Sequence, residues 1–351
     1  MKITMATNKK AKPDFSNLGF GKYFTDHMLV MDYKDGAWSE PEIVPFDSLE
    51  LSPATNCLHY AQGIFEGAKA YKTKEGKITA FRLEENFKRM NRSATRMCMP
   101  NLDINVVMPA LYDLLKLEQD WIPTEKGTAL YIRPTMIASD PMLGVHASHT
   151  YKFFIILSPV GAYYANGMKP TKILVEEHYV RAAIGGTGEA KCMGNYAASL
   201  LASEMAIAKG YDQVLWLDAK EHKYAEEVGA MNMFFVIDGE VITPELVGSI
   251  LPGITRKSSI ELLRSLGYKV TERRISLDEI AEAYENGKLN EAFGTGTAAV
   301  VSPVGLIGYK GRDMIINNQE MGPITAELYD KLTGIQYGVY EDKFGWVNKI
   351  N

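Results

Sequence analysis

Cysteine is scarce in this chain, and its cysteines are not arranged in pairs. The 351 residues include three cysteines, Cys57, Cys98 and Cys192, with no C-x-x-C spacing. This usage argues against a disulfide framework and favours a reducing compartment, so we expect a cytoplasmic protein. The six histidines are scattered, and the closest pair, His146 and His149, has no nearby third ligand. We therefore expect no metal site.

The chain also lacks an excess of positive charge and a long hydrophobic run. Its formal net charge is −5, and no basic stripe or Arg-rich tail is present to neutralise nucleic-acid phosphates. The longest strongly apolar run, FFIILSPVGAYYA, has 13 residues and contains Pro159, whereas a membrane-spanning helix needs about 20. We expect neither nucleic acid nor a membrane as a partner.

The length and the hydrophobic pattern predict two domains of mixed α+β and α/β structure. A chain of 351 residues exceeds the usual limit of a single core. D-G and E-G turns between apolar runs predict antiparallel hairpins within 27–81, and apolar residues at helical spacing predict a helix over 83–97. The predicted boundaries are 1–160 for a smaller α+β domain that begins with a mobile tail at 1–15, 161–170 for a linker, and 171–351 for a larger domain.

Two glycine-bearing loops in the second half suit an anion. The stretch GTGTAA at 294–299 matches a dinucleotide-binding pattern in form, but VVSPV follows it where that motif needs a helix. A plain tight turn is one interpretation, while backbone N–H groups and the hydroxyls of Thr295 and Thr297 suit a phosphate. The loop LPGITRKS places Ile254 and Thr255 just ahead of a predicted helix, SIELLRSLG, at a position that is either an ordinary N-terminus or an anion site. Together the loops favour a single phosphate that is not part of a nucleotide.

A lysine stands in an unusual setting between a glycine-rich loop and a predicted helix. Lys191, in GGTGEAKCMGNYAAS, precedes a helix at 196–209 that is apolar nearly all round and therefore expected to be buried. A free lysine has a pKa of about 10.4 and is almost fully protonated at neutral pH. Burial lowers that pKa and exposes the amine lone pair, as Schiff-base lysines require. The alternative is a lysine that extends to solvent from a helix start.

Further charged residues complete a possible cofactor site. Glu227 immediately precedes an apolar strand, so we expect Glu226 or Glu227 to point inward, where a cation must balance it. Arg89, Arg92 and Arg96 share one face of the predicted helix at helical spacing. This face is either solvated or presents one guanidinium to a phosphate. An amine for an aldehyde, a phosphate cradle and an acid for a pyridinium nitrogen are what pyridoxal phosphate requires.

Several stretches resemble the signatures of class IV (fold type IV) pyridoxal phosphate enzymes, a group that includes the D-amino acid aminotransferases. The resemblance is closest to the branched-chain amino acid aminotransferases and extends from about residue 27 to 345. The matching stretches are FEGAKAY, RMNRSATRMC, YIRP, GTGEAKCMGNYAASLLA, VLWLD, EEVGAMN, ILPGITRKS and FGTGTAAVVSPV.

The resemblance implies a role for particular residues around pyridoxal 5′-phosphate. Lys191 matches the residue that forms the internal aldimine, Tyr196 the one that hydrogen-bonds the phenolic oxygen, and Glu227 the partner of the pyridine nitrogen. The residues that match the phosphate ligands are Arg89, Ile254, Thr255 and Thr297.

The resemblance also implies the substrate contacts and the assembly. Tyr60, Phe65 and Tyr131 match an apolar side-chain pocket, and Arg133 matches the arginine associated with a dicarboxylate co-substrate. The backbone of Thr297 and Ala298 matches the site of the α-carboxylate. Members of the family are homodimers in which a loop of the other subunit reaches the site, and Val145 matches that loop.

Two departures from the family pattern stand out. Ala230 follows E-V-G where close relatives often have threonine, so one hydroxyl near the cofactor or substrate is missing. The stretch after the GTGTA loop, Ala299 to Ser302, also lacks the redox C-x-x-C of some members, so we expect no thiol regulation of that kind.

The implied activity is a reversible ping-pong transamination between leucine, isoleucine or valine and 2-oxoglutarate. Within the same fold the alternatives are a D-amino acid or amine transaminase and an aminodeoxychorismate-lyase-like enzyme. An alternative from another class is a protein that binds phosphate or carries the cofactor without turnover. The sequence leaves open the preference among the three amino acids, the physiological direction and any assembly beyond a dimer.

Overall fold

The chain folds into two compact units, neither of which is continuous in sequence. The computed structural model describes residues 1–161 and 169–350. The predicted linker at 161–170 falls largely on residues 162–168, which lie outside those described. The units comprise Met1–Ala165, Ala190–Met193 and Ile335–Asn351 for unit 1, and Asn166–Glu189 and Gly194–Gly334 for unit 2.

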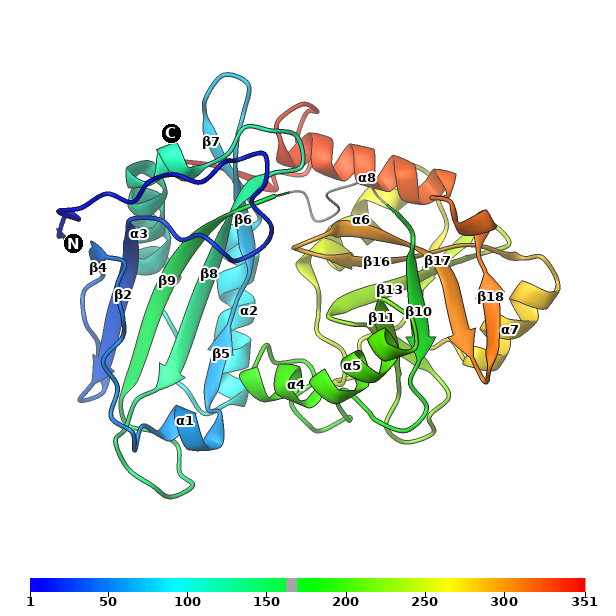
Figure 1. The fold of residues 1–351 in the computed structure, drawn as a ribbon, viewed down its shortest axis with the longest axis horizontal. Helices are drawn as coiled ribbons and strands as arrows, with labels where there is room; N and C mark the ends of the chain where they lie inside the picture. The colour runs from blue at the N-terminus through cyan, green and yellow to red at the C-terminus, as the bar shows by residue number, and fades with distance from the viewer. Residues whose placement is uncertain (162–168, 351) are drawn as a thin grey trace. The chain divides into compact units, whose positions relative to one another are not determined.

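Unit 1 is built on a ten-stranded sheet in the order β1-β4-β2-β9-β8-β6-β7-β19, with β3 paired to β2 and β5 to β8. Helices α2 and α3 pack on one face of this sheet (Figure 1). The strands are β1 Lys2–Ile3, β2 His27–Lys34, β3 Ala37–Trp38, β4 Glu42–Pro45, β5 Gly63–Phe65, β6 Ala68–Lys72, β7 Ile78–Phe81, β8 Ala129–Ala138, β9 Tyr151–Val160 and β19 Val347–Lys349. The helices are α1 Asn56–Tyr60, α2 Leu83–Arg96, α3 Ile104–Leu117 and the 3₁₀ turn η1 Gln119–Trp121.

The local sequence signals of unit 1 are confirmed. Asp35 and Gly36 both adopt positive φ in the β2–β3 hairpin, and Gly76 does so between β6 and β7, as tight hairpin turns require. The predicted helix at 83–97 is α2, which buries its apolar face, Phe87 included, in the core. The tail predicted to be mobile contains a paired strand instead: β1, at its start, pairs in parallel with β4.

Two short segments join unit 1 from the part of the sequence predicted as the larger domain. Ala190–Met193 lies against β5, where Cys192 forms a β-bridge with Ile64. The C-terminal Ile335–Asn351 contributes β19, which pairs antiparallel with β7. Pairing between residues more than 100 positions apart leaves no local pattern, so periodicity could not assign these segments.

Unit 2 contains a sheet that closes on itself. The order β12-β11-β10-β17-β16-β13 is completed by a further pairing of β12 with β13, while β14, β15 and β18 extend the sheet. Its strands are β10 Thr171–Val175, β11 Gln213–Leu217, β12 Ala225–Val228, β13 Met231–Ile237, β14 Glu240–Thr243, β15 Val270–Glu272, β16 Leu289–Gly296, β17 Val300–Tyr309 and β18 Arg312–Ile315. Around them come α4 Met193–Ala198, α5 Leu200–Ala208, α6 Ile254–Ser265, α7 Leu277–Glu285, the 3₁₀ turn η2 Asn317–Gln319 and α8 Pro323–Gln336.

The helix predicted at 196–209 differs from expectation in two ways. It is divided into α4 and α5, and the expectation that it is buried is wrong. Only its small residues Ala202 and Ala206 pack against the sheet, next to Trp216. The large side chains of Leu200 and Ile207 are 63% and 55% exposed. A helix that is apolar all round carries no signal for which face is covered.

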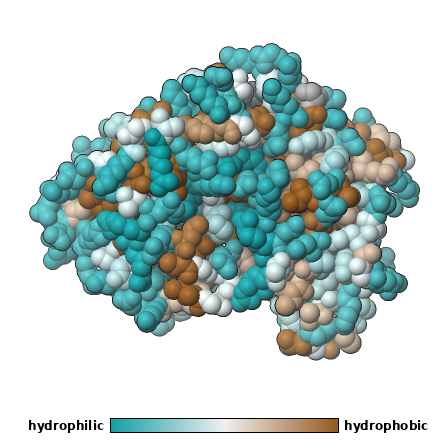
Figure 2. Space-filling model, turned by 180° about the vertical axis from the view of Figure 1, so that it is seen from behind, coloured by the Kyte–Doolittle hydropathy of each residue, from teal (hydrophilic) through white to brown (hydrophobic). Residues whose placement is uncertain are grey.

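The exposed surface mixes polar and apolar side chains. On the face shown in Figure 2, hydrophobic residues form separate groups among hydrophilic ones. Across residues 1–161 and 169–350, we find no helix that combines the length and the apolar character needed to cross a membrane.

Candidate functional site

The backbone of the Lys191 segment is held between β5 and α2 within unit 1. The N–H of Lys191 donates to the hydroxyl of Ser93 on α2 at 2.9 Å, and its carbonyl accepts from the N–H of Phe65 at 3.1 Å. These bonds, together with the Cys192 bridge, place Lys191 beside the FEG stretch and α2. The predicted surroundings of Lys191 therefore exist, but unit 1 supplies them rather than the apolar helix that follows.

The amine of Lys191 has an altered acidity. Its pKa is lowered from 10.5 to about 8: burial is the largest cause, the Arg89 guanidinium also lowers it, and the Glu66 carboxylate opposes both. The ammonium nitrogen lies 5.0 Å from the centroid of the Phe65 ring. A pKa of about 8 leaves about one amine in ten unprotonated at pH 7, and this fraction is available as a nucleophile or a base.

Arg89 does not lie on a solvated face but in a buried ion pair. Its Nε and Nη2 donate to Oε1 and Oε2 of Glu66 at 2.7 and 2.8 Å, and both residues are fully buried. Asn86 donates a further hydrogen bond to Glu66 at 2.9 Å. Burial by itself would raise the pKa of Glu66, but Arg89 and these hydrogen bonds hold it below the ordinary value.

Glu66 is a site residue that was not predicted from the sequence. The available signal was a carboxylate in FEGAKAY, between two apolar strands, followed by an arginine-bearing helix. A buried acid in such a position needs a cation, and α2 provides one. Glu66 therefore joins Arg89 and Lys191 as part of the candidate site.

Strand β8 adds Tyr131 and Arg133 to the same region of unit 1. The guanidinium carbon of Arg133 lies 4.8 Å from the ring centroid of Phe65 and 5.3 Å from that of Tyr131. Arg133 Nη2 donates to the Tyr131 hydroxyl at 3.3 Å, whereas its Nε is buried without a hydrogen-bond partner among the described residues. A Cβ at Gly67 would lie 2.0 Å from that hydroxyl, so glycine is required there.

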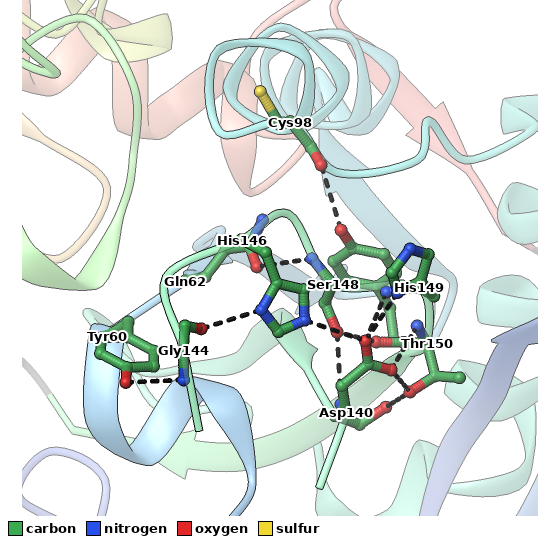
Figure 3. Close-up of polar contacts among 11 residues, drawn as sticks. Tyr60, Gln62, Cys98, Asp140, Gly144, His146, Ser148, His149 and Thr150 are labelled. Carbon is green, nitrogen blue, oxygen red and sulfur yellow. Dashed lines mark hydrogen bonds and ion pairs between the residues drawn. The ribbon is translucent and has the colours of Figure 1, made fainter. Parts of the chain in front are cut away.

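The loop at 139–150 joins β8 to β9 and carries Val145, which is 88% exposed. Tyr60 at the end of α1 accepts a hydrogen bond from the N–H of Gly144 at 2.9 Å (Figure 3). The structure thus places Tyr60 next to the loop that bears Val145.

Glu227 lies on β12 of unit 2 and is 2% exposed. Its Oε2 is 2.9 Å from Arg181 Nη1 and accepts from the N–H of Leu251 at 3.4 Å, while its Oε1 accepts from Asn232 at 3.4 Å. The cation expected beside this acid is therefore Arg181, which the sequence interpretation did not identify. Arg181 stands ten residues before the lysine, and no local pattern connects it with Glu227.

Glu226 is buried as well. Both acids are therefore buried, whereas the sequence predicted that one of the two points inward. Burial raises the pKa of Glu226 to about 7, although a hydrogen bond from the Ser249 hydroxyl opposes the rise. Because neighbouring residues of a strand point to opposite faces, the two carboxylates have different partners.

Helix α6 begins at Ile254, inside the stretch LPGITRKS that was predicted as the loop ahead of the helix, and its first turn has no side-chain cap. Gly253 is the N-cap residue, and a Cβ there would lie 1.9 Å from Asn232 Oδ1. Asn232 is also the β13 partner of Glu227. The buried Ile254 and Thr255 therefore lie close to the carboxylate, at a helix end that attracts anions.

The GTGTAA stretch ends strand β16 at Gly296 and continues through 297–299 into the antiparallel strand β17, so no helix follows it, as the sequence predicts. Thr297 and Ala298 lie in this connection, one strand away from Asn232, which pairs with Thr295. The Thr295 hydroxyl is buried and has no hydrogen-bond partner among the described residues. An anion nearby would satisfy such a donor.

Tyr196 lies on α4 and is partly buried. Its neighbour Asn195 exchanges two hydrogen bonds with Thr187, one from the Thr187 hydroxyl at 2.7 Å and one to the Thr187 carbonyl at 2.8 Å. The glycine-rich stretch is thereby fastened to α4. Taken by units, Lys191, Arg89 and the β8 residues belong to unit 1, and Tyr196, Glu227 and the two loops to unit 2.

Comparisons with known proteins agree on one family. Residues 63–307 match the family described as amino-transferase class IV. The chain is 57% identical to a probable branched-chain-amino-acid aminotransferase of Staphylococcus aureus, over 99% of this chain and 97% of that one. It is 52% identical to branched-chain-amino-acid aminotransferase 2 of Bacillus subtilis, over 100% and 97%. A crystal structure of the branched-chain amino acid aminotransferase from Thermobaculum terrenum, in its PLP-bound holo-form, superposes with a TM-score of 0.73 at 25% identity, over 92% and 98%.

The Arg181–Glu227 pair generates a stability prediction. We expect Arg181→Met to lower the free energy of unfolding by about 3–5 kcal/mol, because it leaves a buried carboxylate without its cation. Adding Glu227→Gln to this variant should recover part of the loss. Urea unfolding of the cofactor-free protein measures both changes. Lys288→Met is the control, since it removes an exposed ion pair with Asp238 and should cost less than about 1 kcal/mol.

The lowered pKa of Lys191 generates a pH prediction for the cofactor-free protein. Below pH 8 the folded and unfolded chains both carry the charged amine, and folding bears the full cost of burying it. Between pH 8 and 10.5 the unfolded chain binds more protons, so the cost declines as pH rises. Lys191→Met should therefore stabilise the protein by roughly 2–3 kcal/mol at pH 7, and less at pH values above 8. The exposed Lys209→Met should show no pH-dependent difference in urea unfolding; a gain from Lys191→Met that stays constant with pH contradicts the prediction.

Proposed function

Because the chain belongs to the amino-transferase class IV family, and within it to the branched-chain-amino-acid aminotransferases, we propose that it transfers the amino group of L-leucine, L-isoleucine or L-valine to 2-oxoglutarate. The reaction is reversible and of the ping-pong type, and yields a branched-chain 2-oxo acid and L-glutamate. The cofactor is pyridoxal 5′-phosphate. The observation that carries the proposal is the Lys191 amine with a pKa of about 8, placed beside the buried Arg89–Glu66 pair.

The described residues fit this cofactor. Lys191 would hold it covalently at the aldehyde carbon, Glu227 would bind its pyridine nitrogen, and Tyr196 would bind its phenolic oxygen. Three observations support the assignment: the lowered pKa of the amine, the buried charge of the acid, and the uncapped N-terminus of α6 near Asn232. The proposed phosphate ligands are Arg89, Ile254, Thr255 and Thr297.

When bound, the cofactor supplies an aldehyde that takes up the amino group and a protonated ring that withdraws electrons from the substrate α-carbon. Lys191 Nζ removes the proton from that α-carbon, which requires the neutral amine that its lowered pKa provides. Glu227 holds the proton at the ring nitrogen. Arg181 favours the anionic form of Glu227, because an adjacent positive charge stabilises a carboxylate.

The two substrates present different side chains to one pocket. We assign the α-carboxylate to the backbone of Thr297 and Ala298, and the branched side chain to the rings around Arg133. With 2-oxoglutarate bound, Arg133 receives the distal carboxylate, and its buried Nε, which has no partner among the described residues, is a suitable donor. With leucine bound, the guanidinium rests against the aromatic rings. The residues that line the pocket in this assignment are Tyr60, Phe65, Tyr131 and Val145.

We further propose a cytoplasmic homodimer in which the Val145 loop reaches the partner's site. The support for the dimer is the exposed apolar end of that loop, where Leu143 is 63% exposed in addition to Val145. The support for a reducing compartment is that Cys57, Cys98 and Cys192 are all free.

Replacing the lysine tests the proposed chemistry. The purified protein should show a visible absorption band that L-leucine removes and D-alanine does not, because the first half-reaction consumes the lysine-bound form. Lys191→Ala should lack the band and lose turnover, while Lys209→Ala keeps both. Substantial leucine turnover in Lys191→Ala would refute the assignment, and a preference for D-alanine would favour a D-amino acid transaminase.

Replacing the arginine tests how the pocket accepts two substrates. We expect Arg133→Gln to lower kcat/KM for 2-oxoglutarate by about 10- to 100-fold, the value of a lost charge-assisted hydrogen bond. The effect on leucine should be much smaller. Arg92→Gln on the exposed face of α2 is the matched control and should alter neither value. Equal losses for both substrates would contradict the role of Arg133.

A further inference from the structure

Three potential metal ligands meet at the base of the loop at 139–150. Asp140, His146 and His149 each direct one ligand atom to the same place, and these atoms all lie within 4.8 Å of one another (Figure 3). Asp140 Oδ2 is 3.4 Å from His146 Nε2 and 3.1 Å from His149 Nδ1. The aspartate was not recognised from the sequence as the third ligand, because six residues separate it from the nearer histidine.

Three hydrogen bonds fix the carboxylate of Asp140 in position. Its Oδ1 accepts from the N–H and hydroxyl of Thr150 at 2.9 and 2.6 Å, and its Oδ2 accepts from the N–H of His149 at 2.8 Å. A carboxylate oxygen has two lone pairs, so Oδ2 retains one for a further partner.

His146 presents a lone pair to this carboxylate. Its Nδ1 lies 2.8 Å from the carbonyl oxygen of Gly144. A carbonyl can only accept, so Nδ1 carries the proton, and Nε2 of the neutral ring has a lone pair directed toward Asp140 Oδ2. Two lone pairs that face one another at 3.4 Å need a cation between them. That cation is either a proton on His146 or a metal ion.

We propose that Asp140 Oδ2, His146 Nε2 and His149 Nδ1 bind a divalent transition metal, with Zn²⁺ the best match. Ligand atoms about 2.0–2.1 Å from a tetrahedral ion are about 3.3 Å apart, and the two distances to Oδ2 fall on either side of that value. Two imidazoles and one carboxylate suit zinc and leave a fourth position for water.

The outer contacts also fit a metal site. A histidine that ligates a metal commonly donates its other ring N–H to a backbone carbonyl, as His146 does to Gly144. Thr150 holds the oxygen of Asp140 that does not face the histidines. The His149 side chain is 81% exposed, so its ring can adjust to the ion without disturbing the core.

A metal here would brace the loop that carries Val145. The loop already has one attachment near its tip, from the N–H of Gly144 to the Tyr60 hydroxyl. A metal would add a second at the base of the loop. The site contains none of the residues assigned to the cofactor, so the proposal does not depend on the proposed function.

Metal titration of the full-length holoenzyme tests the site. After dialysis against a chelator, Co²⁺ should bind at one ion per chain and produce the visible d–d absorption of a tetrahedral site, which Zn²⁺ then displaces. Histidine ligands bind as neutral rings, so binding should weaken on acidification. Absence of this Co²⁺ absorption in the wild-type chain would overturn the proposal and leave a protonated His146 as the explanation of the cluster.

Variants locate the ion. His149→Ala should weaken Zn²⁺ binding in calorimetry by about tenfold or more, and its exposed position makes a folding defect unexpected. His146→Ala should do the same. The control is His178→Ala, an exposed histidine in unit 2, which should bind as the wild type does. Unchanged Zn²⁺ affinity in His149→Ala would overturn the site. Lys191→Ala should still bind Zn²⁺, so a failure of the proposed function is distinguished from a failure of this one.

Discussion

The buried ion pair between Glu66 and Arg89 is the interaction on which the chemistry of unit 1 depends. Both partners are fully buried, and two parallel hydrogen bonds join them. Arg89 lowers the pKa of Lys191 while Glu66 opposes it, so the pair sets the electrostatic surroundings of the amine beyond the effect of burial. Either charge alone would leave the other unpaired in the interior, at a cost that burial makes large. The charges of Glu66, Arg89 and Lys191 therefore form one electrostatically coupled group.

Unit 2 also contains a buried ion pair, between Arg181 and Glu227. Glu227 is buried with Arg181 as its cation, and Asn232 connects it to the glycine that begins α6. Because Asn232 also pairs with Thr295, one amide lies beside the acid, the helix N-terminus and the strand that leads into the GTGTAA turn. A closed sheet brings these elements together, since β12 pairs with β13 and β13 with β16. The rigid strands, and not the loops, determine the spacing.

Local signals in the sequence predicted local structure well. Turn residues located the hairpins and helical spacing located α2, whereas α6 begins earlier than predicted, inside the stretch assigned to a loop. The failures share one cause. The helix at 196–209 was expected to be buried because it is apolar all round, yet composition cannot tell which of its faces another element covers. The segment around Lys191 was assigned to the second domain, although its bridge to β5 places it in unit 1.

The sequence by itself determined the family, and it predicted Lys191, Arg89 and Glu227 as site residues but not Glu66 or Arg181. Glycine turns, an isolated lysine and an acid before an apolar strand can be recognised from the amino-acid sequence alone. Only the tertiary structure decided the partners: Glu66 for Arg89, Arg181 for Glu227, and Asp140 for the two histidines of its loop. The physical reason is that a buried charge is stabilised by whatever opposite charge the fold brings near it. The two buried ion pairs join residues of separate elements, and neither periodicity nor spacing records their approach.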